Sequence, residues 1–140
     1  MSGIPEEVQR IFRAAPFIAE LGMTLESLGQ GECTTALVVE PRHLQQDGFV
    51  HAGVQATMAD HTAGAAVASL VAEGQYVLTV EFKLNLLRAA KAERLSCTSK
   101  VLKPGRSFSV AESEVYAIDA GQTRLVSKLT ATIAVLDKSR

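Results

Sequence analysis

Residues 51–72 of this chain read HAGVQATMADHTAGAAVASLVA, and this stretch decides the fold. It predicts one long helix of about 33 Å, at a rise of 1.5 Å per residue, which ends at Glu73 and Gly74. A helix without a polar face is buried on most of its sides, so we expect it at the centre of the molecule. Its small side chains lie all round the axis, at Ala52, Gly53, Ala56, Ala59, Ala63, Gly64, Ala65, Ala66 and Ala68.

The segments on either side predict the layers that surround this helix. Because consecutive strands joined by tight turns pair antiparallel, we expect a curved antiparallel sheet in which the strands after the long helix form a meander. The predicted fold class is α+β, a single domain over residues 1–140 with the sheet wrapped around one central helix. Periodicity predicts short helices over 5–14 and 17–22, and strands over 23–28, 33–39, 76–87, 94–102, 107–118 and 123–135.

In two of the predicted strands, the side chains of one face are of one kind. In 107–118 one face is made of small residues and could accept a close helix: Ser107, Ser109, Ala111, Ser113 and Ala117. In 76–87 strict alternation places the apolar residues on one face: Tyr76, Leu78, Val80, Phe82, Leu84 and Leu86.

Composition excludes several classes of protein. The 140 residues are 47% hydrophobic and 21% charged, as in one globular domain. The net charge of -1 and the absence of Trp argue against a nucleic-acid binder. The uncharged stretch 62–72 is too short to span a membrane, and residues 1–7 lack the pattern of a signal peptide. Cys33 and Cys97 form no CxxC pair, so we expect a cytoplasmic protein with reduced thiols.

The histidines predict no metal centre. His43, His51 and His61 are 8 and 10 positions apart, so none shares a helix face at metal-ligand spacing. We expect no metal and no cofactor. His61 points about 100° round the helix from Asp60, and we expect it to serve packing or an interface.

Asp60, in the middle of the small-residue helix, is the first candidate for catalysis. A carboxylate in an apolar site is costly unless it is paired or its pKa rises. A raised pKa suits a general base that works near neutral pH. The alternative is that Asp60 faces a solvent channel or bonds a backbone amide of a neighbouring loop.

The start of the helix, residues 47–53, is the second candidate. It has no Ser, Thr or Asn cap, and the first amides of a helix need partners. Such amides can bind a ligand oxygen, because the helix dipole favours negative charge there. Gly48 and Gly53 would let the ligand approach the backbone. The alternative is that Asp47 caps the helix.

The spacing of the two candidates limits how they can cooperate. Ala52 and Asp60 are eight positions apart, about 12 Å along a helix. One helix therefore cannot easily bring its first amide and this carboxylate to the same carbonyl carbon. Two antiparallel helices across a twofold axis can, so we expect at least a homodimer with shared sites.

Residues 46–60, QDGFVHAGVQATMAD, resemble the signature of hotdog-fold acyl-CoA thioesterases of the phenylacetate-degradation type. That signature is Gly-x-x-His-Gly-Gly, followed by an Asp seven positions after the second Gly. Gly48, His51, Gly53 and Asp60 fit the spacing, whereas Ala52 replaces the first Gly of the His-Gly-Gly pattern. The turn KPGR at 103–106 also resembles the Gly-Arg turn of this family, and the order of elements matches over residues 5–137.

The resemblance implies catalytic roles for particular residues. Asp60 would be the nucleophile or the general base, and the amide of Ala52 or Gly53 would polarise a thioester carbonyl. Gln45 stands where relatives carry an Asn that helps to hold this carbonyl. Thr79 stands where relatives carry a Ser or Thr that orients the attacking water or the carboxylate.

Other residues are expected close to the substrate. We expect His51 to bond loop backbone beside it rather than to act as a base. Arg88, Lys103 and Arg106 could meet the phosphates of coenzyme A, the alternative being scattered surface cations.

The function implied by the resemblance is hydrolysis of an acyl- or aryl-coenzyme A thioester to the acid and free CoA. Hotdog dimers of this kind commonly pair again into tetramers. Two alternatives are a non-catalytic acyl-CoA-binding regulator and a hydratase or dehydratase of acyl thioesters. The hydratase would use His51 and Asp60 as its acid–base pair.

Overall fold

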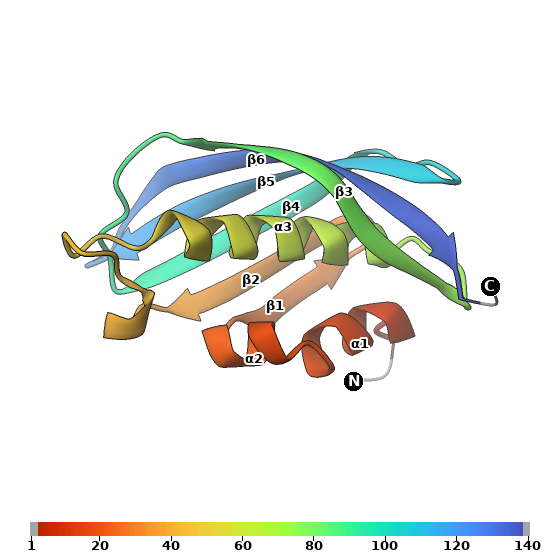
Figure 1. The fold of residues 1–140 in the computed structure, drawn as a ribbon, viewed down its shortest axis with the longest axis horizontal. Helices are drawn as coiled ribbons and strands as arrows, with labels where there is room; N and C mark the ends of the chain where they lie inside the picture. The colour runs from red at the N-terminus through yellow and green to blue at the C-terminus, as the bar shows by residue number, and fades with distance from the viewer. Residues whose placement is uncertain (1–2, 139–140) are drawn as a thin grey trace.

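The computed structural model describes residues 3–138, and its fold is α+β as predicted (Figure 1). One long helix lies against one antiparallel sheet, with two short helices beside it. Among the described residues no helix has the length and apolarity needed to cross a membrane. In chain order the elements are α1 (Glu6–Arg13), α2 (Pro16–Leu21), β1 (Thr24–Gly29), β2 (Glu32–Val38), the 3-10 helix η1 (Pro41–His43), α3 (Ala52–Ala68), β3 (Gln75–Leu86), β4 (Arg94–Lys103), β5 (Phe108–Asp119) and β6 (Gln122–Asp137).

The strand order corrects the predicted meander. The sheet runs β1-β2-β4-β5-β6-β3, so β4, β5 and β6 form a meander while β3 lies at the edge beside β6. The connection from β3 to β4, residues 87–93, crosses the end of the sheet (Figure 1). It is too long for the two-residue turn of a tight hairpin, and strand pattern alone does not reveal such a crossover.

The small-residue face of β5 receives α3, as predicted. The Ser113 hydroxyl donates a hydrogen bond of 2.6 Å to the carbonyl of Ala59 on α3. Of the residues predicted for this face, only Ser107 is exposed, because it precedes the strand. A serine on the sheet can reach the helix backbone because the facing side chains are so small.

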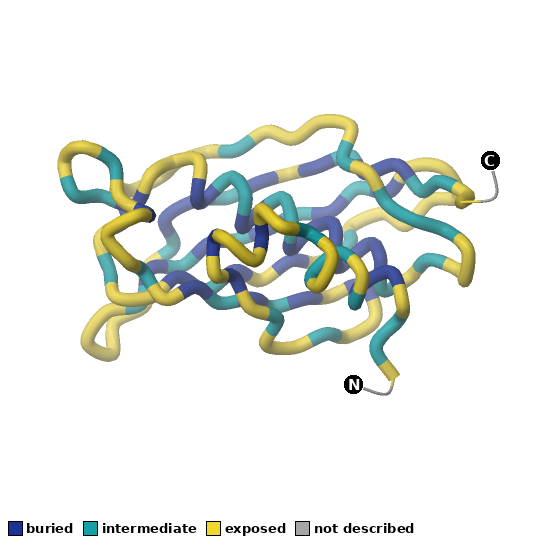
Figure 2. The backbone as a smooth tube through the Cα atoms, turned by 60° about the horizontal axis from the view of Figure 1, so that its bottom comes forward, coloured by how far each residue is buried: buried dark blue, intermediate teal, exposed yellow. Residues whose placement is uncertain are grey.

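Helix α3 is shorter and more open than predicted. It ends at Ala68 instead of residue 72, where Ser69 donates to the Ala66 carbonyl at 2.6 Å and accepts from the Gly31 N–H at 2.8 Å. Residues 62–68 are all buried, but the first half of the helix is covered on one side only (Figure 2). Its open side carries Gly53, Ala56, Thr57 and Asp60.

A β-bulge in β3 divides the apolar face that alternation predicts. The register against β6 shifts between Thr79 and Glu81, and one extra residue turns the following side chains to the opposite face. Leu78 therefore lies on the other face from Phe82. As β3 is an edge strand, large apolar side chains stay 44–59% exposed on it: Leu78, Val80, Phe82 and Leu86.

Candidate active site

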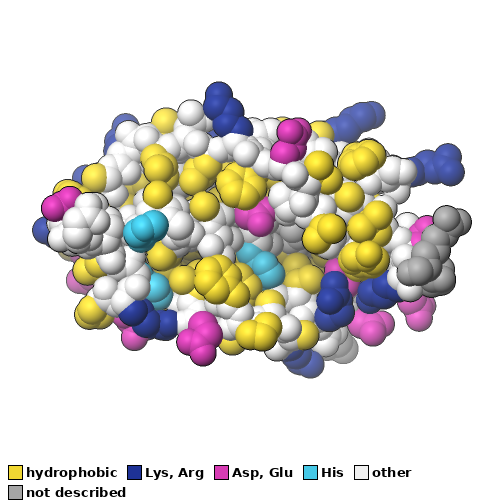
Figure 3. Space-filling model, viewed as in Figure 1, with side chains coloured by type: hydrophobic (Ala, Val, Ile, Leu, Met, Phe, Trp, Pro, Cys, Tyr) yellow, Lys and Arg dark blue, Asp and Glu magenta, His cyan; other side chains and the backbone are white. Residues whose placement is uncertain are grey.

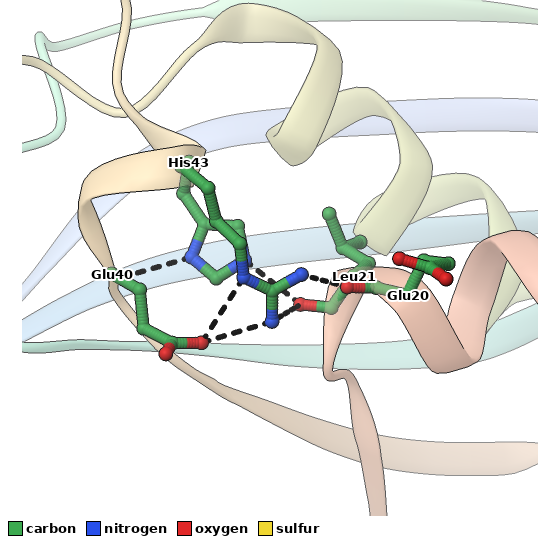
Figure 4. Close-up of polar contacts among 5 residues, drawn as sticks. Glu20, Leu21, Glu40 and His43 are labelled. Atoms are coloured by element: carbon green, nitrogen blue, oxygen red, sulfur yellow. Dashed lines mark hydrogen bonds and ion pairs between the residues drawn. The ribbon is translucent and has the colours of Figure 1, made fainter.

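Buried His43 anchors the loop that leads into α3 (Figure 4). Its Nδ1 accepts from the Glu40 N–H at 2.9 Å, and its Nε2 donates to the Leu21 carbonyl of α2 at 2.8 Å. Arg42 adds a hydrogen bond to the Glu20 carbonyl. The carbonyl of His43 in turn accepts the His51 N–H at 2.9 Å. The residue that precedes α3 is thus tied to the N-terminal helices.

His51 caps α3, so the alternative that Asp47 caps this helix is wrong. The His51 Nδ1 accepts a hydrogen bond of 2.8 Å from the Gly53 N–H, whereas Asp47 bonds its neighbour Gln46. The Gly53 amide is therefore occupied. Among the residues that the structure describes, no acceptor meets the Ala52 N–H. Of the two predicted amides, Ala52 offers the free one, at the positive end of the helix dipole.

Gln45 lies in the loop beside this amide. Its Oε1 accepts from the N–H groups of Asp47 at 2.5 Å and Phe49 at 3.1 Å. These bonds fix the orientation of the carboxamide and leave Nε2 as the group that can donate to a ligand. Gln45 and Ala52 line the same cavity of about 460 Å³, so the structure brings these two predicted residues together.

Asp60 and Thr79 meet in a second, smaller cavity of about 240 Å³. The Thr79 hydroxyl donates to Asp60 Oδ1 at 2.7 Å. Burial raises the pKa of Asp60 above its usual value, and the hydrogen bond from Thr79 opposes part of that rise. The alternative of a carboxylate bonded to a loop amide is wrong, because its partner is this strand hydroxyl. The contact leaves Oδ2 available for chemistry.

The two cavities do not merge within one chain. Ala52 lines the cavity at the start of α3, and Asp60 lines the one halfway along the helix. This separation agrees with the distance along the helix that the sequence predicts.

His61 shares the cavity of Asp60 but points toward α1. Its ring packs edge-on against Phe12, with 4.8 Å between the ring centroids. Burial lowers the pKa of His61 to about 4, so the imidazole is neutral near pH 7. The predicted packing role of His61 is confirmed.

The three candidate cations lie in different places. Arg88 donates to the Leu125 carbonyl at 2.9 Å and lines the cavity of Ala52. Arg106 lines a cavity at the C-terminal end of α3, and Lys103 is exposed at the end of β4. Gly48 adopts a φ of 84°, a left-handed conformation that shapes the loop before the helix.

Sequence reasoning missed Gln55. This side chain is only 3% exposed and lines the cavity of Ala52, and its Oε1 has no hydrogen-bond donor among the described residues. The signal was present, since Gln55 is a long polar side chain three residues after Ala52 in a helix made of small and apolar residues.

Known proteins are similar to this chain in sequence and in fold. The Thioesterase superfamily matches residues 47–123, which include the start of α3, Asp60 and Thr79. A solved thioesterase family protein from Silicibacter pomeroyi is 37% identical, with a TM-score of 0.93 over 96% of this chain and 99% of that one. The 1,4-dihydroxy-2-naphthoyl-CoA hydrolase of Listeria monocytogenes is 25% identical over 95 residues, 68% of this chain and 77% of the relative.

A further solved structure bears on the predicted phenylacetate-degradation type. A phenylacetic acid degradation-related protein from Ralstonia eutropha is 24% identical, with a TM-score of 0.78 over 91% of this chain and 98% of that one. At this identity the likeness shows the fold alone. The chain belongs to the Thioesterase superfamily and has its hotdog-like fold.

Proposed function

We propose that this protein hydrolyses an acyl-coenzyme A thioester to the free acid and CoA. The observation that carries the proposal is the hydrogen bond of 2.7 Å between Thr79 and Asp60, which holds a carboxylate with one free oxygen in a cavity. The free Ala52 N–H supplies the second component, a donor for a carbonyl oxygen. The membership in the Thioesterase superfamily supports the same chemistry.

The reaction can be written with these groups alone. Asp60 removes a proton from water, and the water oxygen bonds to the thioester carbon. The carbonyl electrons move onto their oxygen, where the Ala52 N–H, joined by the Gln45 Nε2, stabilises the charge. When the carbonyl re-forms, the carbon–sulfur bond breaks, and the CoA thiolate takes the proton from Asp60.

Direct attack by Asp60 on the thioester is the other possible route. The carbon–sulfur bond would break, releasing the CoA thiolate, as an anhydride forms between the acyl group and this carboxylate. Water then cleaves the anhydride, and the thiolate takes up the proton that this hydrolysis releases. Label found in Asp60 after a single turnover in ¹⁸O-labelled water would identify the anhydride route, whereas label in the product acid alone is compatible with both routes. Attack by water labels the product acid and never Asp60, whereas cleavage of the anhydride at the Asp60 carboxyl carbon labels this residue.

The two components would meet across a homodimer. Ala52 and Asp60 line separate cavities in one chain, so the Ala52 of one protomer would face the Asp60 of its partner. The surface available for this pairing is apolar. Hydrophobic side chains gather on the face that carries α3 and β3 (Figure 3). An edge strand with exposed apolar residues is a ready template for pairing with a second strand, here Val80 and Phe82 on β3.

Arg88 is the best-placed of the candidate cations for coenzyme A. It lines the cavity of the Ala52 amide, so a phosphate or the pantetheine arm entering there would pass its guanidinium. Lys103 and Arg106 lie away from this cavity, and a role for them requires the partner protomer.

The substitution Asp60→Asn tests the proposal. Across a panel of acyl-CoA substrates, assayed by release of free thiol, we expect turnover to fall at least about 100-fold, because the amide cannot accept a proton. Asp119→Asn, the same change at an exposed residue of β5, should leave turnover unchanged. Saturable binding of acyl-CoA without turnover by the wild type would indicate a non-catalytic binder. Addition of water to crotonyl-CoA would indicate a hydratase.

Stability provides an independent measurement on the same variant. Because the pKa of Asp60 is raised by burial, its ionisation opposes folding at any pH above the ordinary value of about 3.9. Asp60→Asn should therefore melt at a higher temperature than the wild type at pH 7. The difference should shrink as the pH falls through the ordinary value and vanish below it, where the carboxyl is protonated in the unfolded state as well as in the folded one.

A further inference from the structure

The cavity at the start of α3 contains a polar side chain that the proposed reaction does not use. Gln55 is 3% exposed, and its Oε1 has no donor among the described residues. Buried polar atoms in proteins are nearly always hydrogen-bonded, so an exception needs an explanation. In an enzyme one explanation is a ligand that supplies the missing donor.

The position of Gln55 relates it to the reacting carbonyl. It lies three residues after Ala52, so the two share one face of α3. Helical side chains lean toward the N-terminus, which brings the carboxamide of Gln55 toward the free Ala52 N–H. Both residues line the same cavity. The cavity therefore combines a helix-end donor with an unpaired acceptor one turn away.

We propose that Gln55 positions the substrate by accepting a hydrogen bond from an N–H or O–H group of the acyl thioester. This inference rests on the proposed function, in which the thioester carbonyl binds the Ala52 amide. The final side-chain torsion of Gln is soft, so Oε1 can turn toward the cavity. Two parts of the substrate carry a suitable donor a few bonds from the carbonyl: the first amide N–H of the pantetheine arm, and a hydroxyl on the acyl group.

Gln55→Met is the test, because methionine keeps the length of the side chain and removes both polar atoms. The substrates are butyryl-CoA, both enantiomers of 3-hydroxybutyryl-CoA, and the butyryl thioester of propanethiol, which lacks the pantetheine amides. If pantetheine is the donor, kcat/KM should fall about tenfold for every CoA thioester and stay unchanged for the propanethiol ester. If the acyl hydroxyl is the donor, the loss should be confined to a hydroxylated substrate.

Thermal melting shows whether Gln55 serves the fold instead. An acceptor without a partner contributes no hydrogen bond to the folded protein, so Gln55→Met should melt at the wild-type temperature or above it. Gln30→Leu, in the exposed turn between β1 and β2, controls for the loss of a glutamine elsewhere. An unchanged kcat/KM for all substrates, an equal loss for all of them, or a clear drop in melting temperature would overturn the proposal.

A binding measurement keeps this test separate from the test of hydrolysis. Acetonyl-CoA, a thioether that cannot be hydrolysed, retains a carbonyl and the pantetheine arm. Calorimetry should show weaker binding to Gln55→Met than to the wild type by about tenfold if pantetheine is the donor. If the wild type binds this analogue more tightly than Gln55→Met does but turns over no thioester, the hydrolase proposal fails while the role of Gln55 in binding stands. If the wild type neither binds the analogue nor turns over a thioester, both fail.

Discussion

Replacement of Ala52 by proline would remove its backbone N–H and leave the hydrogen bonds of α3 intact. Ala52 is the first residue of α3, a position where proline is favoured because the amide has no partner within the helix. The preceding residue, His51, has a ψ of 140°, which suits a residue before proline. A substitution at Ala52 therefore tests the proposed donor to the thioester carbonyl directly.

Ala52→Pro should lower kcat about 100- to 1,000-fold, as removal of an oxyanion donor does elsewhere. The melting temperature should change little, because no hydrogen bond of the folded protein is lost. Ala52→Gly keeps the N–H and should keep substantial activity. A fully active Ala52→Pro enzyme, measured by thiol release, would exclude this amide from the site.

His61 makes the free energy of unfolding depend on pH. Burial lowers its pKa to about 4, below the value of about 6.5 in the unfolded chain. The unfolded state thus binds a proton first, and the stabilisation by the neutral ring, present above pH 6.5, is lost as the pH falls toward 4. The loss amounts to about 3 kcal/mol, at 1.36 kcal/mol per pKa unit.

His61→Phe should reduce this acid sensitivity, because phenylalanine keeps the aromatic packing against Phe12 and does not titrate. Denaturant unfolding of the variant and the wild type at several pH values between 4 and 7 measures the difference. Parallel stability curves for the two proteins would show that His61 is not the titrating group.

At the scale of elements, the close approach of α3 to the sheet depends on small side chains. Ala59 and Ala63 are fully buried, and Ser113 of β5 reaches the helix backbone. Because protein interiors are packed as densely as organic crystals, a larger residue between these layers would have to displace its neighbours.

Ala63→Leu should therefore lower the free energy of unfolding by about 1–3 kcal/mol through overpacking. Ala19→Leu places the same substitution at an exposed position of α2 and should have little effect. Denaturant melts of both variants give the comparison. Equal stability of the two would mean that the helix is less tightly packed than the structure indicates.

At the scale of the whole molecule, the shared site can be tested by mixing two inactive variants. In a mixed dimer of Ala52→Pro with Asp60→Asn, one site combines the intact Ala52 of one chain with the intact Asp60 of the other. If the subunits exchange freely, the mixture should recover about a quarter of wild-type activity, since half of the dimers are mixed and half of their sites are intact. A mixture that stays inactive after refolding together would contradict the shared site.

The substitution Phe82→Lys tests the surface that would join the protomers. On an edge strand, an exposed lysine discourages pairing. The variant should run as a single chain in analytical ultracentrifugation and lose activity while keeping its fold. The wild type should have the mass of two chains, or of four if dimers pair again. An active single chain would exclude the dimer mechanism.

Several features of this protein could be predicted from local pattern alone. The long helix, the strands and the antiparallel pairing follow from periodicity and turns, because these reflect which side chains face the core. The choice of Asp60 as a candidate for catalysis also followed from the sequence, since a carboxylate among small apolar residues is conspicuous wherever the chain folds. The contact between Asp60 and Thr79 was anticipated only through resemblance to a family.

Tertiary structure decided the rest, because it depends on which distant segments meet. Sequence does not show that β3 leaves the meander for the edge beside β6, nor that a bulge turns its apolar residues to two faces. The cap of α3 is His51, whose N–H is hydrogen-bonded to the carbonyl of His43. The His51 ring accepts the Gly53 N–H, while the Ala52 N–H has no acceptor among the described residues. Hydrogen bonding and burial are properties of neighbours in space, so only the folded chain assigns the free donor to Ala52 and the unpaired acceptor to Gln55.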